Sequence, residues 1–268
     1  MDQTERSLHE ADSGAVRHAI ACVKKSSGLE RFYKRLGADT GKLWGSGTMH
    51  LGSSGIRAPL PRWFRGAAWQ EGLSDRQIQD IEGRWGILFP SDYRLFLRVL
   101  HAQKRRAAFY AHGKGRRVID KGWVFFDCRK DEVAIRGELE RLPERIVDGI
   151  RERGLWLNAW GAKPAAAGGL KRRIVELVHR APPLLPVSSG NYIVSGPDPS
   201  PVFSLHPRTF EFWISAPTFA EFAFREFSPY VSPATGTRWE ALLPASRRKE
   251  PVLPLWSDLA RWCAERLP

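Results

Sequence analysis

The sequence predicts an α+β fold in which a central, mostly antiparallel sheet is flanked by helices. Three observations favour it. Two adjacent capped amphipathic segments stand between residues 74 and 100, short apolar segments crowd together between residues 184 and 214, and further helical segments precede and follow them. Strands that come so close together along a chain favour an antiparallel sheet over a doubly wound parallel one.

The first 58 residues differ in composition from the rest of the 268-residue chain. The stretch 41–55 is rich in glycine and serine, which is typical of linkers. We expect residues 1–58 to be a disordered or loosely structured extension, with a short helix allowed between residues 15 and 36. Residues 59–268 are then expected to form a single domain.

The clearest helical signals open this expected domain. Ser74 and Gln77 have the spacing of a capping box, and Gly86 marks the end of the first helix. The second helix is expected to begin at Ser91 as its N-terminal cap. Its apolar residues recur at helical spacing: Tyr93, Phe96, Leu97 and Leu100. Because the connection is so short, the two helices should pack as a hairpin.

The remaining segments mix strands and helices. Strands are expected at Trp123–Phe126, Gly154–Leu157, Leu184–Val187, Pro201–Leu205 and Thr209–Ile214. Helices are expected at Asp131–Leu139, Ala165–Arg180, Thr218–Phe227 and Ser257–Arg266, while Pro143–Arg153 fits either a helix or a strand. The basic stretch His101–Lys121 lacks periodicity and is typical of an exposed loop or a loose hairpin.

The chain carries a formal net charge of +13 and a pI near 10.1. Such a charge suits an anionic partner, which can be nucleic acid, an anionic membrane or an acidic protein. Part of it lies in clusters that predict a basic surface: Lys104, Arg105, Arg106, Lys114, Arg116 and Arg117. Basic residues beside Phe109 and Tyr110 leave nucleic-acid binding open as an alternative function, although no recognised nucleic-acid module accompanies them.

The sequence lacks recognisable targeting segments, and we therefore expect a cytoplasmic protein. No apolar run approaches the roughly 20 residues of a membrane helix, and the polar N-terminus lacks the apolar stretch of a signal peptide. The three cysteines, Cys22, Cys128 and Cys263, are far apart and form no CxxC pair. We therefore expect neither a disulfide framework nor a zinc site.

The polar residues include no metal-binding pattern and one candidate nucleophile. The seven histidines include no HxH or HExxH pair, so we expect no metal and no cofactor. Cys128 follows an expected strand and is the one candidate nucleophile, which leaves a hydrolase as a further alternative. No histidine motif accompanies it, so a thiol at a strand end explains it better, and we expect a protein without catalytic residues.

Several motifs, in order, resemble one known family. The segment Leu73–His101 carries a capped helix, the turn GILFPSDY and a second amphipathic helix. It resembles the opening of the SUKH superfamily in its Smi/Knr-type branch, which includes cell-wall assembly regulators. Further resemblances to bacterial members follow at Leu155–Pro164, Ala181–Val187, Pro201–Leu205 and Pro254–Leu259. Together with Trp63 and Trp69 upstream, they span about residues 60 to 268.

The resemblance implies an α+β fold and a binding role. Many bacterial members look like immunity proteins, which neutralise a cognate toxin by direct binding, and fungal relatives act as scaffolds. The expected partner is therefore a protein, in particular a toxin domain, with no membrane. Two departures stand out: Gly190 and Asn191 replace a His-Arg pair before Tyr192, and Thr209-Phe210 replaces Thr-Asp. Any binding that those polar residues perform in relatives is in doubt here.

Four residues are candidate partner contacts. They are Trp160 in the WG segment, Tyr192 in the altered triplet, Arg208 in an expected hairpin turn, and Trp213. Strand alternation places Trp213 opposite the apolar residues Phe210 and Phe212. Its side chain is therefore the best single candidate for an aromatic contact with a partner.

Overall fold

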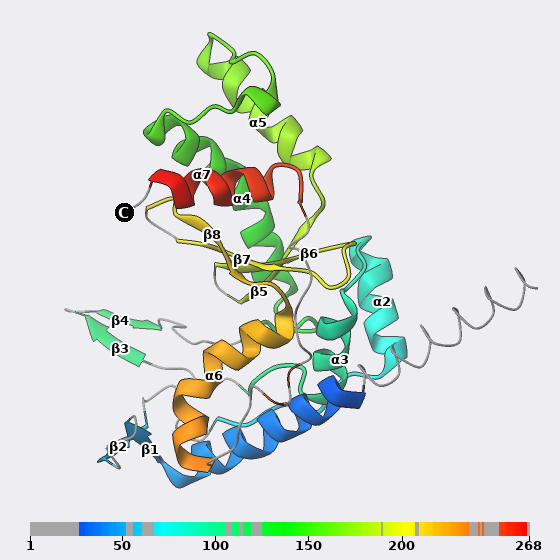
Figure 1. Cartoon of the computed structure of the whole chain (residues 1–268), viewed down its shortest axis with the longest axis vertical. Helices are drawn as coiled ribbons and strands as arrows, with labels where there is room; N and C mark the ends of the chain where they lie inside the picture. The colour runs from blue at the N-terminus through cyan, green and yellow to red at the C-terminus, as the bar shows by residue number, and fades with distance from the viewer. Residues whose placement is uncertain are drawn as a thin grey trace, which may run out of the picture.

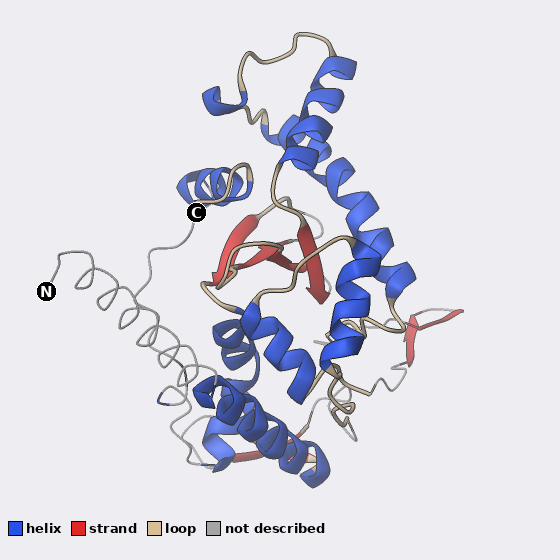
Figure 2. Cartoon of the chain, turned by 90° about the vertical axis from the view of Figure 1, so that its right-hand side faces the viewer, coloured by secondary structure: helices blue, strands red, loops and turns tan. Residues whose placement is uncertain are grey.

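The computed structural model confirms the α+β class. It describes residues 27–51, 56–60, 67–104, 109–112, 115–118, 125–188, 190–206, 209–235, 241, 243 and 252–266. Helices surround a four-stranded antiparallel sheet (Figures 1 and 2). The helices are residues 27–46, α2 (Asp75–Trp85), α3 (Ser91–Val99), α4 (Glu132–Arg153), α5 (Ala167–Arg180), α6 (Phe219–Thr235) and α7 (Trp256–Arg266), with a 3-10 turn η2 (Asn158–Trp160).

The strands form one sheet and two hairpins. The sheet contains β5 (Leu184–Ser188), β6 (Asn191–Val194), β7 (Val202–Leu205) and β8 (Phe212–Ala216). Its spatial order β5-β6-β7-β8 follows the chain, so each strand pairs antiparallel with the next. The hairpins are β1 (Thr48–Leu51) with β2 (Ile56–Pro59), and β3 (Phe109–His112) with β4 (Gly115–Val118).

The sheet separates two helical layers (Figure 1). One layer contains α3, α6 and residues 27–46, and the apolar residues between it and the sheet form the first core. The other layer contains α4, α5 and α7, and the apolar residues between it and the sheet form the second core. Alternation along the strands sends neighbouring side chains to opposite layers. Toward α3 and α6 the sheet presents Leu185, Val187, Ile193, Val202 and Ala216. Toward α4, α5 and α7 it presents Leu184, Tyr192, Val194, Phe203, Leu205 and Phe212.

The helix at residues 27–46 belongs to the first core, which corrects the expected domain boundary. Phe32, Tyr33 and Leu36 are all fully or almost fully buried there. Tyr33 packs edge-on against Phe96 of α3, with ring centroids 5.6 Å apart. The polar composition of the following stretch suggested a loose extension, but buried aromatic rings hold this helix against the rest of the protein.

The α2–α3 hairpin follows the sequence prediction closely. Ser74 and Gln77 form the capping box, and Gly86 ends α2 in the left-handed conformation. One detail is corrected: Ser91 is the first residue of α3, and Pro90 occupies the cap position without a side-chain hydrogen bond. The Ser91 hydroxyl instead donates to Asp198 Oδ1 at 2.7 Å, which ties the hairpin to the β6–β7 connection.

Several other segments differ from the prediction. Residues 131–139 and 143–153 form one helix, α4, that includes Pro143. Residues 154–157 are a turn and an extended connection into η2, and no strand forms there. Strand β6 was not predicted, and β8 begins at Phe212 and not at residue 209. In the expected strand at 123–126, the first two residues lie outside the description, and Phe126 N–H donates to Val187 O at 2.9 Å.

Candidate functional site

Two of the predicted contact residues are buried. Trp160 is 3% exposed and packs edge-on against Trp156, with ring centroids 5.6 Å apart. Tyr192 is fully buried, donates a hydrogen bond to Glu138 Oε2 at 3.3 Å and accepts one from Arg145 Nη1 at 3.2 Å. Burial raises the pKa of Tyr192 to about 12, although Arg145 opposes the shift. Both rings support the second core and offer no side-chain surface to a partner.

Trp213 is placed differently. It lies on β8 with 42% of its surface exposed, and it borders a hollow between the sheet and α6. Arg208, Arg105, Arg106 and Lys114 lie outside the described residues. Lys104 is exposed, and Arg116 and Arg117 are backbone members of β4 whose side chains are not described.

Cys128 does not have the environment of a nucleophile. It is buried, and its Sγ lies 3.6 Å from the hydroxyl of Tyr93. Burial raises its pKa to about 12, and this outweighs the hydrogen bond with Tyr93, which lowers it. A thiol with so high a pKa is not ionised at neutral pH and does not act as an attacking group.

His101 also lies in a buried polar cluster and does not present a charge at the end of α3. Its Nε2 is 3.2 Å from Asp127 Oδ1, and Gln70 Nε2 donates to Asp127 Oδ2 at 2.9 Å. Burial lowers the pKa of His101 to about 4, although Asp127 opposes the shift. The neutral ring therefore has a structural place beside the Asp127 carboxylate.

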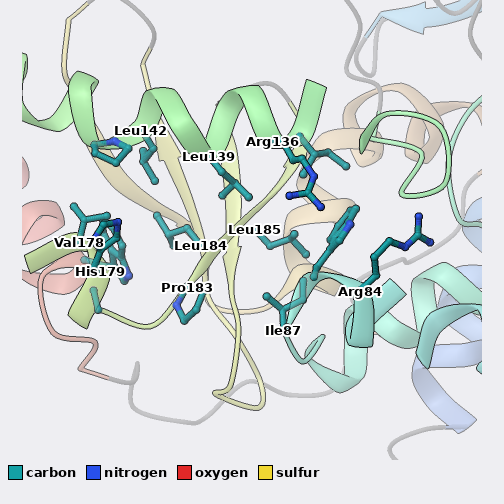
Figure 3. A pocket seen from close by; sticks show the side chains of 16 residues that line it. Arg84, Ile87, Arg136, Leu139, Leu142, Val178, His179, Pro183, Leu184 and Leu185 are labelled. Carbon is teal, nitrogen blue, oxygen red and sulfur yellow. The ribbon is translucent and has the colours of Figure 1, made fainter. Parts of the chain in front are cut away.

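An apolar groove lies between α4 and β5 and extends to the turn after α2 (Figure 3). Leu139 and Leu142 of α4 form one wall, and Pro183, Leu184 and Leu185 follow the opposite wall. Val178 and His179 of α5 stand at one end, and Ile87 stands at the other. The cavity measures about 380 Å³. This volume falls within the range of pockets that hold ligands in other proteins, roughly 300–1,000 Å³.

Two arginines mark the α2 end of the groove. Arg84 and Arg136 both bind the single carboxylate of Glu132, at 3.1 Å and 2.9 Å. Each arginine side chain is about half exposed. Two guanidinium groups share one carboxylate here, so this end carries net positive charge and retains N–H donors for a further carboxylate.

Apolar and polar groups at the same end lack partners. Leu88, directly after Ile87, is 65% exposed, and Val133, directly after Glu132, is 86% exposed. The ring N–H of Trp85, which lines the groove, is buried and has no acceptor in the part of the chain that the structure describes.

Residues of three sequence motifs line this groove together, and the sequence did not predict that they would. The end of α2 and the turn after it supply Trp85, Gly86 and Ile87, and Trp256 comes from the C-terminal motif. The segment 181–187 supplies Pro183, Leu184 and Leu185. Reasoning from sequence missed Arg84, Arg136 and Leu139. Helical periodicity assigns such residues to one face of a helix, but it does not show whether another part of the protein covers that face.

Metal ions and membranes gain no support from the described residues. Among them, no three histidine, cysteine, aspartate or glutamate side chains are grouped to hold a metal ion. Within the same residues, no helix is long and apolar enough to cross a bilayer.

Fold and site together define an α+β protein with a solvent-open apolar groove that has a basic end. No family model, no curated protein and no solved structure matches the chain.

Proposed function

We propose that the protein is a non-enzymatic binding module that accepts an extended segment of a partner protein in the groove between α4 and β5. The observation that carries the proposal is the combination of leucine walls with two arginines at one end. Apolar side chains of the segment would replace water along Leu139, Leu184 and Leu185. A carboxylate of the segment would bind Arg84 and Arg136, which favour planar anions.

The net charge supports a partner of the opposite sign. A chain of charge +13 attracts an acidic protein over the distance of a Debye length and so accelerates encounter. The buried and unpartnered N–H of Trp85 would gain an acceptor from a carbonyl or carboxylate of the bound segment. These features favour an acidic segment with apolar side chains over a purely apolar one.

We further propose, from the resemblance to Smi/Knr-type proteins, that this partner is a toxin domain and that the protein acts in the cytoplasm as its immunity protein. In that role it neutralises the toxin by covering a surface that the toxin needs. The burial and raised pKa of Cys128 do not support the hydrolase alternative, because nucleophilic attack requires an accessible thiolate.

Selection of peptides tests the groove without knowledge of the partner. A random peptide library is selected on the wild-type protein and on the double variant Arg84→Glu and Arg136→Glu, whose side chains are exposed enough to change without unfolding. Arg151→Glu on the same α4, 63% exposed, is the matched control. Peptides with acidic and apolar residues should bind the wild type and the control, and should lose at least tenfold in affinity on the double variant.

The immunity role is tested separately. Each reading frame adjacent to this gene is produced with and without the protein as a candidate toxin, and cell survival and the dissociation constant are measured. Protection that the double variant loses and Arg151→Glu keeps supports the proposal, whereas a toxin that neither binds nor is neutralised contradicts it. Binding of a DNA or RNA oligonucleotide with a steep salt dependence would favour the nucleic-acid alternative instead.

A further inference from the structure

A second hollow lies on the face of the sheet that α6 covers only in part. It measures about 480 Å³ and is lined mainly by Asn191, Ser204, Trp213, Ser215 and Glu226. Ser204 of β7 pairs across the strands with Trp213 of β8, so both side chains stand on the same face. The other half of this face is apolar and packs against α3 and α6. The hollow is therefore the part of the sheet where the first core ends.

The hydroxyl hydrogens in this hollow are already used. The Ser204 hydroxyl donates to Asn191 Oδ1, and the Ser204 and Ser215 hydroxyls are themselves hydrogen-bonded. Because Ser204 has only one hydrogen and gives it to Asn191, Ser215 must donate to Ser204. Asn191 Nδ2 donates to Ser188 Oγ at 2.9 Å. The Ser204 and Ser215 oxygens therefore offer a ligand only their lone pairs, which accept hydrogen bonds.

Glu226 adds a carboxylate that has no counter-charge among the described residues. Its Oε2 atom is buried and receives no hydrogen bond in the part of the chain that the structure describes. The neighbouring Arg225 directs its guanidinium to the backbone carbonyl of Ser215 and forms no ion pair with Glu226 among the described residues. Burial raises the pKa of Glu226 to about 7. A buried carboxylate without a cation is costly, so a bound cation would be favoured here.

We propose that this hollow, which we call the Glu226 site, binds a primary alkylammonium group. The ammonium carries three N–H donors, which match the Glu226 carboxylate and the oxygen lone pairs of Ser215 and Ser204. The alkyl chain lies along the Trp213 ring, whose face attracts a cation within about 6 Å. The ring of Phe222 closes the apolar side of the hollow.

Two positively charged or titratable groups also border the Glu226 site, Arg225 of α6 and His206 at the end of β7. Thr209 N–H donates to Nδ1 of His206 at 3.3 Å, so this nitrogen is occupied by a backbone group. Arg225 is held at Ser215 O, on the backbone. A slender ammonium fits beside these groups better than a bulky guanidinium, which would meet the Arg225 charge over a wider area. The site is thus selective for lysine-like over arginine-like cations.

A titration followed by ¹H–¹⁵N spectra at pH 8 tests the proposal on the full chain. The probes are n-butylammonium and N-acetyl-lysine methylamide, and the neutral control is N-acetyl-norleucine methylamide. Both amines should shift the Trp213 indole signal with millimolar dissociation constants, and the norleucine compound should shift it at least tenfold less. Glu226→Gln should weaken both amines at least tenfold, while Glu265→Gln, at an exposed position of α7, should change nothing.

The two probes separate the two sources of this chemistry. Tighter binding of the lysine compound than of butylammonium indicates a lysine side chain of a protein partner, and equal binding indicates a free amine. Equal shifts from the norleucine compound, or unchanged binding to Glu226→Gln in a folded variant, would overturn the Glu226 site, as would no shift at 50 mM probe. None of these results bears on the groove, which lies along β5 and not on β8.

Discussion

The carboxylate of Asp92 in α3 accepts a hydrogen bond of 2.8 Å from the backbone N–H of Phe219, the first residue of α6. Its other oxygen accepts from Tyr93 N–H at 2.9 Å, and Asp92 itself is 3% exposed. The first N–H groups of a helix have no partner within the helix. Asp92 therefore caps α6 from a position 127 residues before Phe219, and the Thr218 hydroxyl caps the same first turn by accepting from Glu221 N–H.

This buried cap predicts a pH effect on stability. Burial raises the pKa of Asp92 from 3.8 to about 6, against the hydrogen bonds from Ala220, Phe219 and Tyr93. The folded state thus binds the proton more tightly than the unfolded state, and the contribution of Asp92 to stability falls as pH rises from about 4 to 6. Two pKa units correspond to about 3 kcal/mol. Asp92→Asn should lack this decline, as urea unfolding from pH 4 to 7 would measure.

The comparison is a difference between two proteins, because other groups titrate in the same range. The free energy of unfolding of the wild type, minus that of Asp92→Asn, should fall across the interval. If this difference stays constant within about 0.5 kcal/mol, which is the accuracy of such measurements, ionisation of the buried Asp92 carboxylate does not lower the stability of the folded state.

His101 predicts the opposite sign. It is buried in the left-handed conformation, with φ 59°, and burial lowers its pKa from 6.5 to about 4. The unfolded state therefore binds the proton more tightly. The stabilising contribution is complete above pH 6.5 and is lost as pH falls toward 4, by about 3 kcal/mol. His101→Asn cannot titrate and tolerates the positive φ, so it should not show this loss. An NMR titration in which His101 protonates above pH 6 would contradict the prediction.

Two glycines of α4 form a matched pair. A Cβ on Gly149 would lie 1.9 Å from the Phe210 ring, whereas a Cβ on Gly137 would meet its nearest neighbour, Arg141 Nη2, at 3.6 Å. Gly137→Ala should raise the free energy of unfolding by about 0.5–1 kcal/mol, because alanine suits a helix better than glycine. Gly149→Ala should lower it by about 1–3 kcal/mol through overpacking. Urea unfolding of both variants measures this contrast, and equal signs would contradict the contact between α4 and Phe210.

The helix at residues 27–46 provides a fourth prediction. Phe32 is fully buried, so Phe32→Ala should cost about 3–5 kcal/mol of stability by leaving a cavity in the first core. Lys34 on the opposite side of the same helix is 65% exposed and pairs with Glu30 at 2.6 Å. Lys34→Ala should change stability by less than about 0.5 kcal/mol. Thermal unfolding distinguishes the two variants. A Phe32→Ala variant with unchanged stability would contradict the packing of this helix in the first core and would support the loose extension that the sequence suggested.

Local signals were the most predictable part of this fold. The capping box of Ser74 and Gln77 and the left-handed Gly86 depend only on neighbouring residues, and both were predicted from their spacing. Composition gave a wrong prediction for residues 27–46, because the glycines and serines after Trp44 suggested a linker. Phe32 and Tyr33 are buried by rings that are distant in the sequence, and composition does not show such contacts. Likewise Leu155 and Leu157 suggested a strand, but no neighbouring strand is there to pair with them.

The sites were less predictable because their residues meet only in three dimensions. Strand alternation separated Trp213 from the apolar face, since this needs only the period of two, but it left open whether the ring is exposed or covered by a helix; the ring is 42% exposed. Tyr192 and Trp160 could not be distinguished from surface aromatics without knowledge of α4 and α5, which cover them. Arg84 and Arg136 come from separate helices, and a shared carboxylate brings them together.

A sheet enclosed by helices on both faces restricts how this sequence can drift over evolutionary time. Every residue of β5 and β7 is buried, so a substitution at almost any position there disturbs one helical layer or the other. Strand β8 is the exception, since Trp213 opens to solvent and its neighbours Ile214 and Ser215 are only partly covered. New specificity can therefore arise at that corner of the sheet while the remaining strands stay constrained.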